Sequence, residues 1–150
     1  MTSALEEIVT EFQESDVEEK KELLIDFAKK LPPLPERFEA LKDEAHRVHE
    51  CQSPVFLFVE VNGGQVRLFA DAPIEAPTVR GFVSLLVEGL NGAKVHEVAD
   101  LKFDLIRRLG LVDVLGMLRL NGLQGVLHRV KAEVIKASAL ADLASQKTPS

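Results

Sequence analysis

The chain has 150 residues, of which 46% are hydrophobic and 28% charged, and its formal net charge is −6. These values predict a single globular domain over residues 1–150, and the acidic balance, with no Trp or Tyr, argues against a nucleic-acid or anionic-membrane partner. No apolar run is long enough to cross a bilayer, and the acidic start lacks the basic and apolar regions of a signal peptide. We therefore expect a cytoplasmic protein.

Two helices are predicted near the N-terminus. Ser3-Ala4-Leu5-Glu6 and Ser15-Asp16-Val17-Glu18 both have the Ser-x-x-Glu spacing of a capping box. The apolar stripe of the second helix consists of Leu23, Leu24, Phe27, Ala28 and Leu31. Pro32-Pro33 cannot continue a helix, so the second helix is expected to end at Leu31.

The next segment, Glu36–Glu50, is rich in charge and fits more than one structure. Phe38 and Leu41 are compatible with a short helix, and the rest is compatible with a segment that wraps the surface. A short extended piece is also possible at Arg47-Val48-His49.

A β-hairpin is predicted in the middle of the chain. Val55–Val61 is apolar, β-branched and aromatic, as expected of a strand. Asn62-Gly63-Gly64 then supplies a tight turn, with Asn-Gly providing the positive φ angles, into a second strand at Gln65–Ala70. The first strand is apolar on both faces, which predicts that helices cover it. The second strand alternates, with Val66 and Leu68 on one side.

A helix is predicted after the hairpin. Pro77 suits its first turn, apolar residues recur at helical spacing from Val79 to Leu90, and Asn91-Gly92 stops it. Gly81 inside this helix costs about 1 kcal/mol relative to Ala, which indicates close backbone packing at that point.

Further helices complete the predicted fold. Short ones are expected at 94–98, at Leu101–Leu109 with Asp100 as its cap and Gly110 as its end, and at 111–118. A long helix from about Gly122 to Ala144 would bury Leu123, Val126, Leu127, Val130, Val134, Ala137 and Ala141. The elements together predict an α+β domain, in which a small antiparallel sheet of two or three strands packs against several helices.

The single cysteine lies in Glu50-Cys51-Gln52-Ser53-Pro54, directly before the first strand. From residue type alone, a lone cysteine is most simply a small buried hydrophobe. Its polar, turn-prone neighbours instead predict a loop at a surface edge. An exposed thiol without a partner in its own chain cannot form a structural disulfide, so it is either incidental or reactive. The backbone N–H groups and side-chain donors of Gln52 and Ser53 are suited to support a sulfur anion.

Other chemistries are less compatible with the sequence. His46, His49 and Cys51 are close together, but zinc sites usually have four ligands, and in an extended segment His46 would face away from the other two. We therefore expect no metal and no cofactor. His49 is either an aid to the ionisation of Cys51 or an exposed surface histidine. The chain has no hydrolase nucleophile motif, phosphate loop or dinucleotide fingerprint, so a stand-alone enzyme is the weaker class.

The segment Arg47–Leu57 resembles the cysteine loop of SufE-type sulfur acceptors. The resemblance extends to three further stretches, which are Leu31–Pro35, Ala76–Phe82 and the Arg-x-Asn-Gly motif at Arg119–Gly122. The chain differs from many family members at Glu50, where they have glycine. A carboxylate at that position should raise the pKa of the Cys51 thiol.

This resemblance implies a SufE/IscU-like fold and a function in sulfur transfer. Cys51 would take persulfide sulfur from a SufS-type cysteine desulfurase, stimulate that enzyme, and relay the sulfur for iron–sulfur cluster assembly, with a downstream scaffold as a further partner. Arg119 would dock the desulfurase or stabilise the sulfur anion, and Gln52, Ser53 and His49 would support the site. The alternative is a cluster-assembly scaffold that binds metal through Cys51 and nearby histidines.

Overall fold

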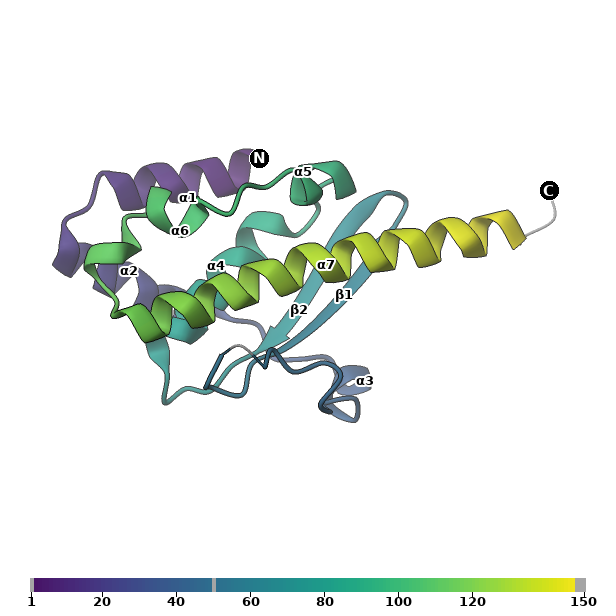
Figure 1. Ribbon diagram of the computed structural model, residues 1–150, viewed down its shortest axis with the longest axis horizontal. Coiled ribbons are helices and arrows are strands. Elements are labelled where there is room, and N and C mark those ends of the chain that lie inside the picture. Colours follow the sequence, from purple (N-terminus) through teal and green to yellow (C-terminus); the bar gives the residue numbers. More distant parts are fainter. Residues whose placement is uncertain (1, 50, 148–150) are drawn as a thin grey trace.

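The structure, a computed structural model, describes residues 2–49 and 51–147. Its elements follow the order α1 (Ser3–Gln13), α2 (Val17–Lys30), α3 (Glu36–Glu39), β1 (Phe56–Asn62), β2 (Gln65–Asp71), α4 (Pro77–Leu90), α5 (Val95–Ala99), α6 (Leu105–Arg108), the 3₁₀ helix η1 (Leu111–Asp113) and α7 (Met117–Lys147). Figure 1 shows α7 crossing the molecule beside the two-stranded antiparallel sheet. The predicted α+β fold is confirmed.

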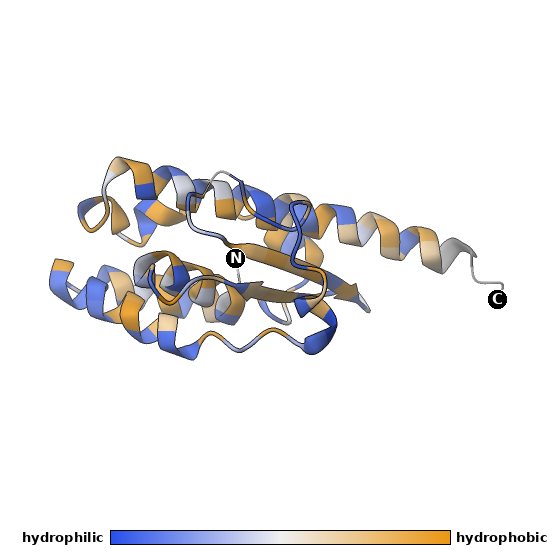
Figure 2. Ribbon diagram, turned by 90° about the horizontal axis from the view of Figure 1, so that it is seen from below, coloured by the Kyte–Doolittle hydropathy of each residue, from blue (hydrophilic) through white to orange (hydrophobic). Residues whose placement is uncertain are grey.

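One face of the hairpin forms the core together with α4 and α7. The register places Leu57 opposite Ala70 and Val59 opposite Leu68, so these side chains share a face. Of the two strands, β1 packs against α7 and β2 packs against α4. As predicted, Val66 and Leu68 are buried on the same side. Figure 2 shows the hydrophobic colouring of the strands alongside α7.

The opposite face of the hairpin is covered by residues 36–47. Phe38 of α3 stacks on Phe58, with 4.7 Å between ring centroids, and His46 stacks on the same ring at 4.8 Å. The prediction that helices cover β1 therefore holds for one face only. On the other face, aromatic side chains from a one-turn helix and an irregular segment provide the cover.

The hairpin turn consists of Gly63 and Gly64. Asn62 is still paired with Gln65, and the two glycines have φ angles of 60° and 78°. The prediction that Asn62 supplies a positive φ is therefore wrong, because the second glycine of the run provides the second turn position without steric cost.

Both N-terminal helices are present, but each is capped by a residue next to the predicted one. The Thr2 hydroxyl accepts the N–H of Leu5, and the Asp16 carboxylate accepts the N–H of Glu19 at 2.9 Å. The Glu19 side chain in turn accepts the N–H of Asp16 at 3.1 Å, which completes a capping box. Asp caps a helix as well as Ser does, so the sequence did not distinguish Ser15 from Asp16 as the N-cap of α2. α2 ends before the prolines, as predicted.

Gly81 allows α2 and α4 to approach closely. A Cβ at this position would overlap the backbone carbonyl oxygen of Leu24 on α2. Backbone atoms cannot move aside as the end of a flexible side chain can. The predicted close packing at Gly81 is therefore confirmed, and it fixes the position of α4, whose N-terminus leads to the site described below.

We expect Gly81→Ala to lower the free energy of unfolding by about 1–3 kcal/mol, because the added methyl group overpacks a backbone contact. Urea unfolding followed by circular dichroism measures this change. Gly116→Ala is the matched control, since a Cβ there would have no atom within 4 Å. Equal stability of the two variants would contradict a close α2–α4 contact.

The helices after α4 differ in detail from the prediction. Asp100 is the C-cap of α5 rather than the N-cap of the next helix, and α6 begins after Asp104. Asp occurs twice within five residues, and the sequence alone did not indicate which one precedes the helix. Gly110 ends α6 as predicted, with a φ of 70°.

α7 begins at Met117, so its predicted start near Gly122 is wrong. The predicted apolar stripe is buried as far as Val134, whereas Ala137 and Ala141 are only half-buried. Among residues 2–49 and 51–147, none of the helices combines the length and apolar character that a membrane span requires.

Candidate functional site

The cysteine loop, residues 49–54, leaves the sheet and returns to it between two buried valines. Val48 and Val55 are fully buried, and the N–H of Val48 donates to the carbonyl oxygen of Val55 at 2.8 Å. Arg47 pairs with Phe56 in an isolated antiparallel bridge. Of the extended piece predicted at Arg47-Val48-His49, only Arg47 takes part in this β pairing. The loop is thus closed at its base, and Glu50 lies outside the described residues.

Cys51 is buried, with 4% of its surface exposed, so its predicted position at a surface edge is wrong. The two valines at the loop base pack into the core and bring Cys51 against α7. A Cβ on residue 122 would lie 3.4 Å from Cys51 Sγ and 3.6 Å from its Cα. The bare backbone of Gly122 therefore leaves the space in which the thiol lies.

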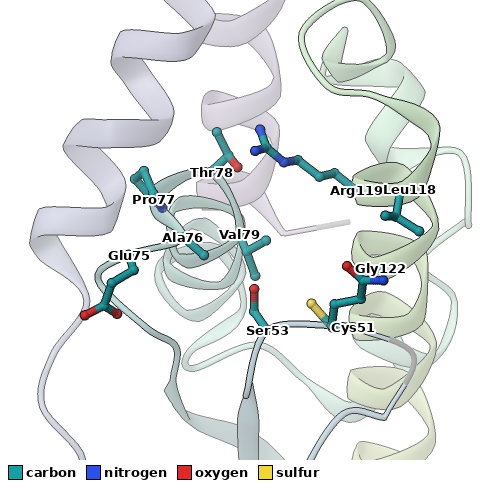
Figure 3. Close-up of a pocket in the computed structure, with 11 residues that line it drawn as sticks. Cys51, Ser53, Glu75, Ala76, Pro77, Thr78, Val79, Leu118, Arg119 and Gly122 are labelled. Atoms are coloured by element: carbon teal, nitrogen blue, oxygen red, sulfur yellow. The ribbon is translucent and has the colours of Figure 1, made fainter.

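Cys51 borders a cavity of about 400 Å³. The cavity is lined by residues 51–53 of the cysteine loop, residues 75–79 at the start of α4, and Leu118, Arg119 and Gly122 of α7. In Figure 3 the sulfur points into this space, with Ser53 and Val79 across from it. The fold thus brings Cys51 together with Gln52, Ser53 and Arg119, three of the residues singled out in the sequence.

Three features act on the ionisation of Cys51. Burial raises the pKa of the thiol, and this is the largest effect. A hydrogen bond from the backbone N–H of Ser53 and the positive charge of Arg47 both act to lower this pKa. At rest, the thiol is therefore held protonated, while a donor and a cation that would stabilise its anion are already close.

His46 and His49 contact groups other than the thiol. His49 is exposed, and its Nε2 lies 2.7 Å from the carbonyl oxygen of Glu44. The Nδ1 of His46 lies 2.7 Å from Asp43 Oδ1. In the part of the chain that the structure describes, no group of three or more His, Cys, Asp or Glu side chains is arranged to hold a metal ion. Neither histidine lines the cavity at Cys51.

Arg119 lies in the first turn of α7 and is exposed on the rim of the cavity. In Figure 3 its guanidinium group extends toward Thr78, away from the sulfur of Cys51. It forms no hydrogen bond or ion pair with another described residue. Its charge is thus turned outward rather than toward the resting thiol.

Two residues of the site escaped the sequence interpretation. Gly122 was predicted as a helix start and as part of the Arg-x-Asn-Gly motif, but not as a contact of the thiol, although a glycine within a helical apolar period already indicates a close contact. Arg47 belongs to a segment that the sequence left undefined. Its charge reaches Cys51 only because the chain reverses through the cysteine loop.

The chain is similar to known proteins over most of its length. Residues 6–134 match the family described as SufE, Fe-S metabolism associated domain. A SufE-like protein of Mycobacterium tuberculosis is 38% identical over 138 residues, which cover 91% of this chain and 95% of that protein. The cysteine desulfuration protein SufE of Plasmodium vivax is 28% identical over 136 residues, or 88% of this chain and 53% of that protein.

A solved structure shares the fold. The solution structure of a hypothetical protein from Thermus thermophilus superposes with a TM-score of 0.80 at 37% sequence identity. The match covers 93% of this chain and 98% of that one.

Proposed function

This chain belongs to the SufE family, which is associated with Fe–S metabolism, and from that membership we propose that Cys51 accepts persulfide sulfur from a SufS-type cysteine desulfurase. The family supports a sulfur-acceptor role. The observation that carries the proposal is the placement of the chain's single cysteine on a cavity of about 400 Å³, which leaves room for an added sulfur atom. By emptying the desulfurase cysteine, the protein stimulates that enzyme, and it then relays the sulfur to a scaffold for cluster assembly.

The transfer needs only the Cys51 nucleophile and the desulfurase persulfide, with no oxidant or reductant. The Cys51 thiolate attacks the outer sulfur of the desulfurase persulfide, an S–S bond forms at Cys51, and the desulfurase S–S bond breaks. The desulfurase cysteine leaves as a thiolate and takes up a proton, so there is no net oxidation. A persulfide is more acidic than a thiol, so the product is an anion, and the backbone N–H of Ser53 is placed to stabilise it.

Burial gives the thiol a protected resting state. A persulfide that is open to solvent would lose its sulfur to small thiols in a reducing compartment, which we propose is the cytoplasm. Because Cys51 is 4% exposed, the cysteine loop must move before another protein's cysteine can reach it. Docking of the desulfurase would provide that movement.

The rim of the cavity supports docking by a protein partner. Leu118, which lines the cavity, is 64% exposed, and its neighbour Met117 is 74% exposed. Ile74, next to the lining residue Glu75, is 77% exposed. Apolar side chains so exposed around one cavity are typical of an interaction surface, and the outward charge of Arg119 adds a polar anchor to it.

We expect Arg119→Ala to weaken binding of the desulfurase by roughly fivefold to tenfold, the effect of losing one charged contact at an interface rim. The free protein should react with iodoacetamide at an unchanged rate, because Arg119 points away from the sulfur. Calorimetry measures the affinity, and intact mass measures the alkylation.

The matched control for this prediction is Arg107→Ala, which removes an exposed arginine that does not line the cavity. Normal binding and sulfur acceptance by Arg119→Ala would contradict a role of Arg119 in docking. Slower alkylation of the free variant would instead place its role at the thiol.

The proposed function is tested by the rate of sulfide release from L-cysteine by a cysteine desulfurase, with and without this protein and in the presence of a reductant. Faster release in its presence is the expected result. A metal titration separates the alternative, a metal-binding scaffold that uses Cys51 and the nearby histidines. Stoichiometric zinc or iron without stimulation would favour the scaffold and overturn the proposal.

A further inference from the structure

The chain segment that leads into the cysteine loop, residues 45–48, lies beside the start of β1, and we call it the stem. The carbonyl oxygen of His46 and the N–H of Val48 form hydrogen bonds of 3.0 and 2.8 Å with the chain that enters β1. The carbonyl oxygens of Ala45 and Arg47 accept none of these bonds. These two oxygens need partners from elsewhere in the fold.

Arg129 of α7 bonds to both of these oxygens. Its Nη1 donates to the carbonyl oxygen of Arg47 at 3.0 Å, and its Nη2 donates to that of Ala45. Its Nε donates to Glu133 Oε1 at 3.0 Å, and the side chain is only 21% exposed. A planar guanidinium group can bond two carbonyl oxygens at once through separate N–H groups, whereas a lysine amine is a point donor.

We propose that Arg129 is a positioning residue that fixes the stem to α7, so that the cysteine loop opens on a stationary base. Gly122, against which the resting thiol lies, is seven residues earlier on α7, about two helical turns away on the same face. One helix thus carries both the contact for the closed loop and the clamp on its stem. This inference rests on the proposed function, because only a thiol that is delivered to a partner needs a moving loop on a fixed base.

A fixed stem also holds a cation at the base of the cysteine loop. Arg47 belongs to the stem, and its charge favours the thiolate form of Cys51. With its carbonyl group bound to Arg129, the backbone of Arg47 stays in place while the loop opens. The thiol would therefore leave its buried position while the stem, which carries this charge, stays fixed to α7.

The test compares three variants of the full chain. Arg129→Met keeps an unbranched side chain and removes every hydrogen-bond donor. Arg129→Lys keeps the positive charge but loses the paired Nη donors. Glu133→Gln is the control, because it leaves both bonds to the stem carbonyls in place. Hydrogen exchange measures the protection of the stem amides, and alkylation of free protein measures exposure of Cys51. Sulfur acceptance is measured at saturating desulfurase.

We expect exchange of the stem amides to be at least tenfold faster in Arg129→Met, which corresponds to about 1.4 kcal/mol, with a smaller increase in Arg129→Lys and none in Glu133→Gln. Alkylation should become faster while sulfur acceptance becomes slower, and exchange in α1 and α2 should stay at the wild-type rate, which separates this effect from a general loss of stability. If Arg129→Met does not fold, Arg129→Lys supplies the same comparison.

Stem amides that exchange at the wild-type rate in Arg129→Met overturn the inference. An increase spread equally over the stem, α1 and α2 also overturns it, because it would report global destabilisation. So does an equal effect of Glu133→Gln. These outcomes are distinct from failure of the proposed function, which is decided by whether the wild-type protein accepts sulfur at all.

Discussion

Cys51→Ser is expected to abolish both sulfur acceptance and stimulation of the desulfurase. A hydroxyl group is not ionised at neutral pH and cannot form a stable persulfide, and the chain has no second cysteine to replace Cys51. Sulfide release in the presence of the variant should equal that of the desulfurase alone. Full stimulation by Cys51→Ser would refute the relay mechanism.

The burial of Cys51 calls for a second variant as a control on folding. A hydroxyl group at this buried position, without a new hydrogen-bond partner, costs about 1–3 kcal/mol of stability. Cys51→Ala removes the sulfur without adding a polar group, so it should unfold close to the wild-type midpoint. Loss of function in both variants, with the Ala variant stably folded, would assign the effect to the missing thiol.

Gly122→Val is expected to make Cys51 react with iodoacetamide between about tenfold and a hundredfold faster. The added side chain overpacks the closed loop by about 1–3 kcal/mol, and opening of the loop relieves this strain and exposes the thiol. The nearest atoms to a Cβ at residue 122 all belong to Cys51, so the branched side chain meets the cysteine before anything else. α7 itself should remain intact, because Val is a better helix former than Gly. The alkylation rate under native conditions, followed by intact mass, measures the effect.

Two matched variants define the size limit at this position. Gly122→Ala places its Cβ at contact distance from Sγ, so the thiol should stay covered while the helix gains stability. Gly116→Val adds the same side chain just before α7, where nothing lies within 4 Å of a Cβ. Unchanged alkylation in Gly122→Val would show that Gly122 does not determine the resting position of the loop.

The sequence predicted the elements whose signals are local. Proline restricts its own backbone, as in the run after α2 and at Pro77, and the hairpin glycines permit the positive φ angles of a tight turn. The structure places boundaries at all three positions. Gly81 was informative for the same reason, because a glycine inside a helical pattern already implies a close neighbour.

The position of the thiol could not be predicted, because it depends on contacts between distant parts of the chain. Polar neighbours suggested an exposed loop, but the side chains of Val48 and Val55 bury its base and bring Cys51 to α7. The clamp at Arg129 joins residues separated by 82 and 84 positions. No pattern within either segment indicates that pairing, which exists only once α7 packs on β1.

The most direct measurement is the mass of the protein after incubation with a cysteine desulfurase and L-cysteine in the absence of reductant. The wild-type chain should gain the mass of one sulfur atom, the gain should map to the peptide that contains Cys51, and a reductant should remove it. Cys51→Ser should gain nothing under the same conditions. No added sulfur on the wild-type protein, or added sulfur that persists in Cys51→Ser, would contradict persulfide transfer to Cys51.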